Sequence, residues 1–210
     1  MQELWLPLFP LQVVLLPGAE LPLHIFEERY KEMIREVLRD RVEFGVILAS
    51  EKGIVNTGCT ARVEKVLREY PDGRSDILTI GRRRFELLGV NDERAFLRGS
   101  VEFFDDDDAS PTQPEVLQRA VDGYNQWREL SSENPLTAGE AKDPQLSFRL
   151  AQSIQDLGVR QTLLALRSEA ARLRQLAEFF PAHLAKQRHI QHVKQVAPRN
   201  GHSTLVPPIA

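Results

Sequence analysis

The 210 residues include 27 Lys and Arg against 30 Asp and Glu, a net charge of −3, and 42% are hydrophobic. These values are ordinary for a globular protein and exclude a strong overall attraction to nucleic acid or to an acidic membrane. The charge is uneven, because residues 1–108 hold 15 basic and 21 acidic residues, a net −6, whereas residues 109–210 hold 12 and 9, a net +3. The acidic first half argues against RNA binding there.

Cys59 is the only cysteine, so no internal disulfide can form, which suits a reducing compartment. Its neighbours supply no base that would activate a thiolate, so we expect a buried structural thiol. The N-terminus lacks the positive charges of a signal peptide. The uncharged run Leu4–Ala19 contains three prolines and is shorter than the ~20 residues of a membrane-spanning helix. We therefore expect a cytoplasmic protein that does not enter a membrane.

The stretch Pro7–Phe26, PLFPLQVVLLPGAELPLHIF, is rich in Leu and Val and is interrupted by prolines. Proline lacks the N–H that a helix interior or a central strand requires, so no long element can run through this stretch. Pro17–Gly18 is a turn signal, because proline fixes φ and glycine accepts a positive φ. We expect two or three short buried strands that form the seam of a small β-barrel or a strongly bent sheet.

A helix is predicted to begin near Glu27, with one apolar stripe formed by Phe26, Tyr30, Met33, Ile34, Val37 and Leu38. Strand patterns follow it, at residues 43–49, 59–69, 76–88 and 97–104. Pro71–Gly73 predicts the turn of a hairpin between the second and third of these strands. Gly81, inside the third strand, predicts a bulge or a sharp bend.

The acidic run Asp105–Asp108 is interpreted as a solvated linker, because it lacks the alternating ligands and the glycine of a calcium loop. Beyond it the pattern becomes helical. Helices are expected after a capping box at 112–115, from Asp143 to a stop at Gly158, at 159–166, and after a cap at Ser168. Pro181 should bend the last helix or end it early. Strands followed by helices predict an α+β chain.

Several segments carry a family likeness: PLFPL at 7–11, VLLPG at 14–18, LPLHIFEERY at 21–30 and FGV at 44–46. Later landmarks are GCTA at 58–61, PDG at 71–73, GRRRF at 81–85, RQTLL at 160–164 and RLRQL at 172–176. Together they resemble the N-terminal, substrate-binding domain of Lon proteases. The resemblance implies a PUA-like β-barrel with one packed helix at 1–108, a helical bundle at 109–195 and a flexible tail at 196–210.

Full-length Lon proteases continue into an ATPase module and a protease with a Ser–Lys pair. This sequence lacks the G-x-x-x-x-G-K-[ST] phosphate loop, and none of its lysines stands in a context like that of the catalytic pair. The family's catalytic residues therefore have no counterparts here. The resemblance implies a free-standing, non-catalytic binding protein without a cofactor or a metal. Its expected partner is unfolded or exposed polypeptide, and a separate protease or chaperone could act with it.

Two groups of residues are candidate contacts for a polypeptide. Strand alternation places Arg82 and Arg84 on one face, where they could bind a carboxylate or a phosphate or could simply pair with surface acids. The same alternation leaves Phe85 on the other face. Large aromatic side chains could line an apolar groove between barrel and helices, namely Phe85, Trp127, Phe179 and Phe180. Packing in the core is the alternative for each of these aromatics.

Other functions have weaker support. RNA binding is an alternative, because PUA-like barrels elsewhere bind RNA and Arg82–Arg84 are basic, but the acidic first half opposes it. A hydrolase with an unrecognised site is a third hypothesis, although there is no G-x-S-x-G motif. We expect His24 in the core or at the entry of the first helix. His189 and His192 share a helix face, but two ligands do not make a zinc site.

Overall fold

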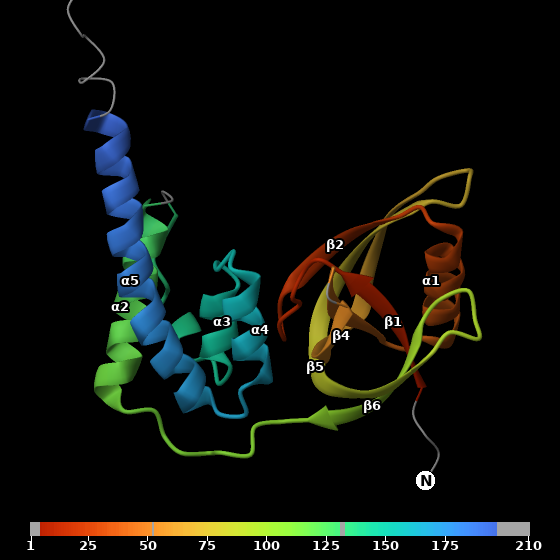
Figure 1. The fold of residues 1–210 in the computed structure, drawn as a ribbon, viewed down its shortest axis with the longest axis horizontal. Coiled ribbons are helices and arrows are strands. Elements are labelled where there is room, and N and C mark those ends of the chain that lie inside the picture. Colours follow the sequence, from red (N-terminus) through yellow and green to blue (C-terminus); the bar gives the residue numbers. More distant parts are fainter. Residues whose placement is uncertain (1–4, 52, 131–132, 197–210) are drawn as a thin grey trace, which may run out of the picture.

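The computed structural model describes residues 5–51, 53–130 and 133–196, with side chains described as far as residue 185. The fold is mixed α+β: a six-stranded sheet with one helix lies beside a group of helices (Figure 1). The elements in chain order are β1 (Trp5–Leu11), β2 (Glu20–Ile25), α1 (Glu28–Asp40), β3 (Phe44–Ser50), β4 (Gly53–Glu69), β5 (Ser75–Asn91), β6 (Arg98–Phe104), α2 (Pro114–Leu130), a 3₁₀ turn (Glu140–Lys142), α3 (Leu146–Ala151), α4 (Leu157–Ala165) and α5 (Glu169–Val196).

The strands pair in the order β2-β5-β4-β3-β1-β6, and a further pairing of β5 with β6 closes five of them into a ring. All the pairs are antiparallel except β1 with β3. Among the described strands, β2 pairs with β5 alone and lies outside the ring. The proline-rich start of the chain forms two short strands, as predicted, and Gly18 in the turn before β2 has φ 73°.

Gly81 lies in β5 where the segment before β2 passes over it. Its N–H donates to the Ala19 carbonyl and its carbonyl accepts from the Gly18 N–H, both at 2.9 Å. A Cβ at this position would lie 2.1 Å from the Leu16 carbonyl oxygen, so the close approach requires glycine. Immediately after Gly81 the register of β4 and β5 shifts, which confirms the predicted bulge and interrupts the strict alternation of side chains along β5.

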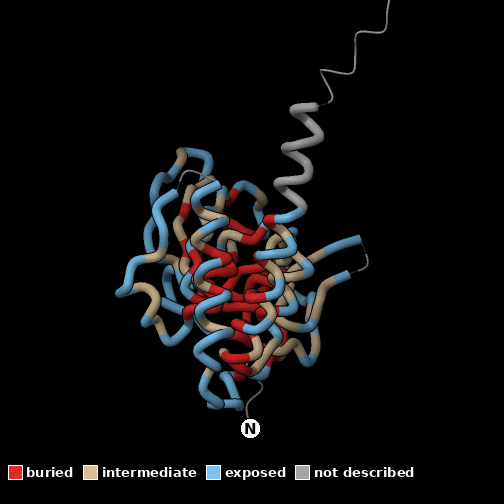
Figure 2. The backbone as a smooth tube through the Cα atoms, turned by 90° about the vertical axis from the view of Figure 1, so that its left-hand side faces the viewer, coloured by how far each residue is buried: buried red, intermediate tan, exposed pale blue. Residues whose placement is uncertain are grey.

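The buried side chains form two clusters. The smaller cluster lies among the strands of the ring and comprises Leu6, Leu8, Ile47, Phe85 and Val101. The larger cluster joins α1 to the sheet and continues into the helical part. Figure 2, in which the two parts overlap along the line of sight, shows buried segments in the centre and exposed segments around them. The two parts therefore share one apolar interior rather than meeting through a polar seam alone.

Helix α1 presents most of its predicted stripe to the sheet, with Tyr30, Met33, Ile34 and Val37 buried. The two ends of the predicted stripe are exposed, since Phe26 precedes the helix and Leu38 lies at the margin of the buried face. The helix ends at Arg41, whose left-handed backbone, φ 55°, turns the chain towards β3.

The predicted end of the helix from Asp143 to Gly158 was wrong, because α3 already ends at Ala151 and α4 begins at Leu157. Gly158 lies in the first turn of α4 instead of ending a helix. Asp156 starts that helix, and its carboxylate accepts from the Val159 N–H at 3.0 Å. An N-cap carboxylate satisfies an otherwise unpaired helical N–H, so it is a stronger signal than the following glycine.

The start of α5 agrees with the prediction, because the Ser168 hydroxyl accepts from the Ala171 N–H at 3.2 Å. The helix does not end early at Pro181, which was one of the two predicted outcomes, since α5 continues through it to Val196. A proline inside a helix removes one backbone hydrogen bond. The fully buried Phe180 before the proline packs where α2 carries Gly123, and His183 after the proline contacts Trp127 of α2, so α5 meets α2 on both sides of Pro181.

Asp106 connects the strand part to the helical part. Its carboxylate accepts from Arg84 of β5 at 2.6 Å and from both terminal nitrogens of Arg172 of α5 at 2.7 and 2.6 Å. Arg84 also donates to the Leu166 carbonyl at 2.6 Å, and Arg172 donates to Glu169 at 2.8 Å. The two arginines are 6% and 1% exposed. The acidic run is therefore not a uniformly solvated linker, because one of its carboxylates neutralises two buried cations.

No helix in the described ranges is long and apolar enough to cross a membrane. Within the same ranges, no group of three or more His, Cys, Asp and Glu side chains is arranged to hold a metal ion. The side chains of His189 and His192, and the predicted tail from residue 197 onward, lie outside the described part of the chain.

Candidate functional site

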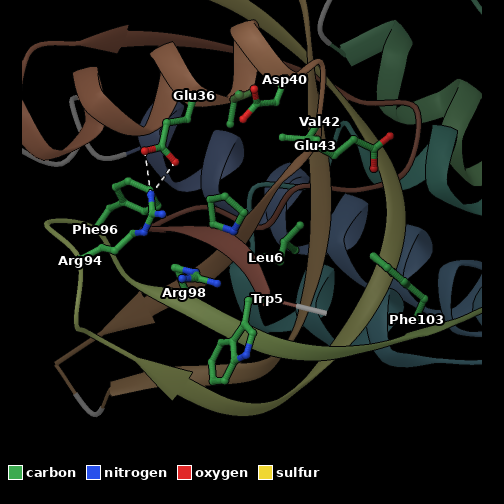
Figure 3. Close-up of a pocket in the computed structure, with 12 residues that line it drawn as sticks. Trp5, Leu6, Glu36, Asp40, Val42, Glu43, Arg94, Phe96, Arg98 and Phe103 are labelled. Carbon is green, nitrogen blue, oxygen red and sulfur yellow. Dashed lines mark hydrogen bonds and ion pairs between the residues drawn. The ribbon is translucent and has the colours of Figure 1, made fainter. Parts of the chain in front are cut away.

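A groove of about 380 Å³ opens between α1 and the ends of β1 and β6 (Figure 3). Its apolar lining comprises Trp5, Leu6, Pro7, Val37, Val42, Phe96 and Phe103. Its charged lining comprises Glu36, Asp40, Glu43, Arg94 and Arg98. The volume is that of a site for a few side chains, and the lining combines aromatic surface with a small number of charged groups.

The chain builds this groove from separate elements. The left-handed turn at Arg41 brings Val42 and Glu43 from the end of α1 to the groove. On the opposite side Phe96, which is almost fully buried, anchors the connection between β5 and β6. Trp5 stands at the start of β1, where the backbone pairs with β6 at Ser100. The helix and the strands therefore face each other across the groove, as Figure 3 shows.

Two arginines stack on aromatic rings of the groove. The Arg98 guanidinium lies 5.7 Å from the centre of the Trp5 ring. The Arg83 guanidinium lies 3.9 Å from the centre of the Phe103 ring. Stacking of this kind keeps the planar cation near apolar surface while its N–H groups remain available to anions. The strand side of the groove thus offers aromatic area and positive charge together.

The acidic residues of the groove already have partners. Glu36 accepts from Arg94 through both oxygens, at 2.7 and 2.8 Å (Figure 3). Asp40 accepts two hydrogen bonds from the neighbouring Arg39, both at 2.8 Å. These pairs are partly exposed, so each contributes little to stability, but they balance the charge of the helix side.

Glu43, the third acid of the groove, accepts from the Thr60 hydroxyl at 2.5 Å. It also lies 4.0 Å from Arg82, which places this residue of the predicted basic cluster beside the groove. Arg82 is exposed. The contact of Arg82 with Glu43 agrees with the alternative to anion binding, in which Arg82 pairs with a surface acid.

The other two predicted strand residues lie in the interior. Arg84 faces the helical part and is held by Asp106, so it is not available to a ligand in this conformation. Phe85 is fully buried in the smaller cluster, with Gly58 against its ring. The bulge changes which way the arginines of β5 face. Between the pairs Ala61–Gly81 and Cys59–Arg84, β4 has one residue and β5 has two, Arg82 and Arg83. Adjacent arginines therefore point to different parts of the molecule.

The three aromatics predicted in the helical part lie together between α2 and α5. Phe180 is fully buried, whereas Trp127 and Phe179 are half-buried. The His183 ring stands between the latter two, with ring centres 4.8 Å from Trp127 and 5.1 Å from Phe179. Trp127 and Tyr124 border a second cavity of about 480 Å³, whose remaining lining is mostly polar. The four aromatics that were predicted to line one groove are thus divided, with Phe85 inside the ring of strands and the other three between α2 and α5.

His24 is outside the core. Its ring is partly exposed and Nδ1 lies 2.5 Å from an Asp76 oxygen, with Tyr70 donating to the other oxygen at 2.8 Å. Hydrogen bonds from His24 and then Tyr70 hold the pKa of Asp76 below its ordinary value. Burial raises the pKa of the Cys59 thiol to about 12, so it is not an activated nucleophile.

Comparison with known proteins identifies what this architecture resembles. The family model for the ATP-dependent protease La (Lon) substrate-binding domain matches residues 5–184. The Lon protease of Parabacteroides distasonis is 29% identical over 123 residues, which are 54% of this chain and 14% of that protease. The chain therefore spans only about a seventh of the length of this relative.

Two solved structures are similar over most of the chain. A Lon N-terminal domain protein from Xanthomonas campestris has 29% identity and a TM-score of 0.67, and the match covers 84% of this chain and 98% of the other. The N-terminal domain of Lon protease from the Mycobacterium avium complex has 16% identity and a TM-score of 0.59, covering 85% and 99%, and supports the fold alone. With the ring of strands, the packed helix α1 and the match over residues 5–184 in agreement, this chain belongs to the Lon substrate-binding domain family.

Proposed function

We propose that this chain is a non-catalytic module that binds unfolded or exposed polypeptide in the groove beside α1. The family match supports the substrate class, and the groove supports the place. An unfolded segment presents bulky apolar side chains that a folded protein hides, and the groove offers Trp5, Leu6 and Phe103 to receive them. The open apolar groove on a substrate-binding domain is the single observation that carries the proposal.

The architecture suits a binding role. In this proposal the closed ring of strands is a PUA-like barrel within residues 1–108, and residues 109–195 form a helical subdomain fastened to it through Asp106. A rigid platform limits the entropy lost when a flexible polypeptide is captured. A separate protease or chaperone would process the captured chain, and the lone buried thiol suits the reducing cytoplasm.

The test measures binding of a permanently unfolded, carboxymethylated protein to the full chain by fluorescence anisotropy. Val42, which is 45% exposed at the edge of the groove, is replaced by Asp. The new carboxylate should weaken binding about fivefold or more, because an apolar side chain that contacts this position would remove water from the carboxylate. Leu130→Asp is the matched control, since Leu130 is 43% exposed on α2 and does not line the groove.

Two results would overturn the proposal. One is a wild-type protein that binds the unfolded chain no better than an unrelated globular protein of similar charge. The other is a Leu130→Asp variant that loses affinity while Val42→Asp keeps it, because that would move the site to the helical part. Circular dichroism of both variants establishes that they remain folded.

A further inference from the structure

Among the described residues, the charges that line the groove are balanced except at one position. Glu36 is engaged by Arg94, Asp40 by Arg39, and Glu43 by Thr60 and Arg82. Arg98 is the remaining charged group of the lining, and it forms no ion pair with a carboxylate in the described part of the chain. Once the internal pairs among the described residues are set aside, Arg98 remains as the positive charge of the lining that has no acidic partner among them. It lies among apolar side chains, where water screens it less than on an open surface.

The backbone holds Arg98 firmly in place. It is the first residue of β6, which is paired on both sides: Arg98 stands opposite Pro7 of β1 and opposite Asn91 of β5. Its guanidinium stacks on Trp5, and in Figure 3 both side chains lie on the strand side of the groove. Because the residue is half-buried and its strand cannot shift alone, the cation is positioned before any ligand arrives.

We propose that the groove prefers polypeptide segments in which an acidic side chain stands next to a bulky apolar one. The carboxylate would pair with Arg98, while the apolar side chain contacts Trp5 and Phe103. The inference rests on the proposed function and adds to it a rule of sequence preference. A planar guanidinium binds a carboxylate through two parallel hydrogen bonds, which fixes the orientation of the segment as well as its charge.

A basic side chain in the same position is disfavoured by the same geometry. It would approach Arg98 directly, and to reach a carboxylate it would have to displace Arg94 from Glu36, Arg39 from Asp40, or Thr60 and Arg82 from Glu43. Displacing an existing pair returns little, because one ion pair is exchanged for another. The groove therefore prefers an acidic over a basic side chain in the polypeptide, although acids outnumber arginines in its lining.

The experiment uses three extended peptides, each with a phenylalanine. The residue next to the phenylalanine is Asp in the first peptide, Asn in the second and Lys in the third. All three carry amidated C-termini. Binding to the wild-type chain of 210 residues should weaken about threefold to tenfold from Asp to Asn, and further to Lys, as expected for one partly desolvated ion pair. In Arg98→Gln the Asp and Asn peptides should bind alike, and in Arg98→Glu the order should reverse so that Lys binds best.

The matched control is Arg68→Gln. Arg68 also stacks on an aromatic ring, with its guanidinium 4.6 Å from the centre of Tyr70, but it lies outside the groove. This variant should keep the wild-type order of the three peptides. The reversal expected in Arg98→Glu cannot come from unfolding, because an unfolded variant would bind none of the peptides in a charge-dependent order.

The outcomes separate this inference from the function on which it rests. If the wild type binds the Asp and Asn peptides equally while Val42→Asp still weakens binding, the groove binds polypeptide and the acidic preference is wrong. If removing the C-terminal amide strengthens binding and the Asp-to-Asn change has no effect, Arg98 recognises a chain end and the side-chain preference is overturned. If none of the peptides, and no unfolded protein, binds the wild type, the proposed function itself fails.

Discussion

The Asp106→Asn substitution tests whether one carboxylate holds the two parts of the molecule together. Asparagine keeps the size of the side chain but removes its charge. It also replaces one accepting oxygen by an NH₂ group, which would face the donors of Arg84 or Arg172. Arg84 then keeps its bonds to the carbonyls of Leu164 and Leu166 but has no carboxylate partner.

The expected loss follows from the burial of the partners. Removing one member of a buried ion pair costs about 3–5 kcal/mol, because the other charge stays buried without compensation. The Asp106 side chain keeps 29% exposure and Glu169 still holds Arg172, so solvent screening lowers our estimate to about 2–3 kcal/mol. For a chain of this length that loss corresponds to a decrease in Tm of about 5–10 °C.

The loss should depend on pH in a defined direction. Burial alone would raise the pKa of Asp106, but the hydrogen bonds and charges of Arg172 and Arg84 outweigh it and hold that pKa below its ordinary value. A carboxyl with a lowered folded-state pKa contributes its stability above the unfolded-state pKa and loses it as the pH falls through the folded-state pKa. The difference between wild type and variant should stay constant from about pH 7 to pH 5 and shrink below about pH 4.

Urea unfolding followed by circular dichroism at several pH values measures this difference. Asp107→Asn is the matched control, since it removes the adjacent exposed carboxylate and should change the free energy of unfolding by less than about 0.5 kcal/mol. Equal losses in the two variants would refute a specific role for Asp106. A difference that did not shrink between pH 5 and pH 3, with both proteins still folded, would refute the assignment of the effect to the charge of Asp106.

Two further predictions concern buried positions. Gly81→Ala should destabilise the fold by about 3 kcal/mol or more in urea unfolding, because the new Cβ would lie 2.1 Å from a backbone oxygen that cannot move freely. Gly139→Ala, with no atom within 4 Å of the added Cβ, is its control and should have little effect, so equal losses would contradict the steric argument. The Cys59 thiol, with its pKa raised to about 12 by burial, should resist a maleimide reagent at pH 8 in the folded protein and react once guanidinium unfolds it. Rapid labelling of the folded protein would show that the thiol is accessible.

Local patterns predicted the elements that depend on their own residues. The stripe of α1, the hairpin turn at Pro71–Gly73 and the cap at Ser168 each follow from a few adjacent side chains, and the structure contains all three. The lengths of β4 and β5 did not follow in this way. Each has 17 residues, because different parts of the strand pair with different neighbours, and those neighbours are distant in sequence. Pairing of this kind leaves no local pattern.

The groove was not predicted because its residues come from separate stretches of the chain. Trp5 precedes the stretch Pro7–Phe26 in which the first buried strands were predicted, and Phe103 falls within the last predicted strand. Nothing in either pattern indicates that both rings remain partly exposed and line the same groove. Val42 gave the sequence signal that was most useful for finding the groove, because it is an apolar residue outside the helical stripe. In the structure it is exposed and follows the left-handed turn at the end of α1.

The run Arg82–Arg84 shows how a single bulge directs adjacent side chains to different parts of the molecule. Strand alternation predicted that Arg82 and Arg84 share one face, yet Arg82 lies beside Glu43 of the groove and Arg84 is bound to Asp106 at the interface between the two parts. Arg83, between them, stacks on Phe103 of the groove. Groove and interface therefore share two consecutive residues of β5 and a neighbouring pair on β6, Phe103 and Phe104. Asp106 does not line the groove. A change in groove affinity in folded Asp106→Asn would thus reflect a shift of these shared strands, because no contact to the polypeptide has been removed.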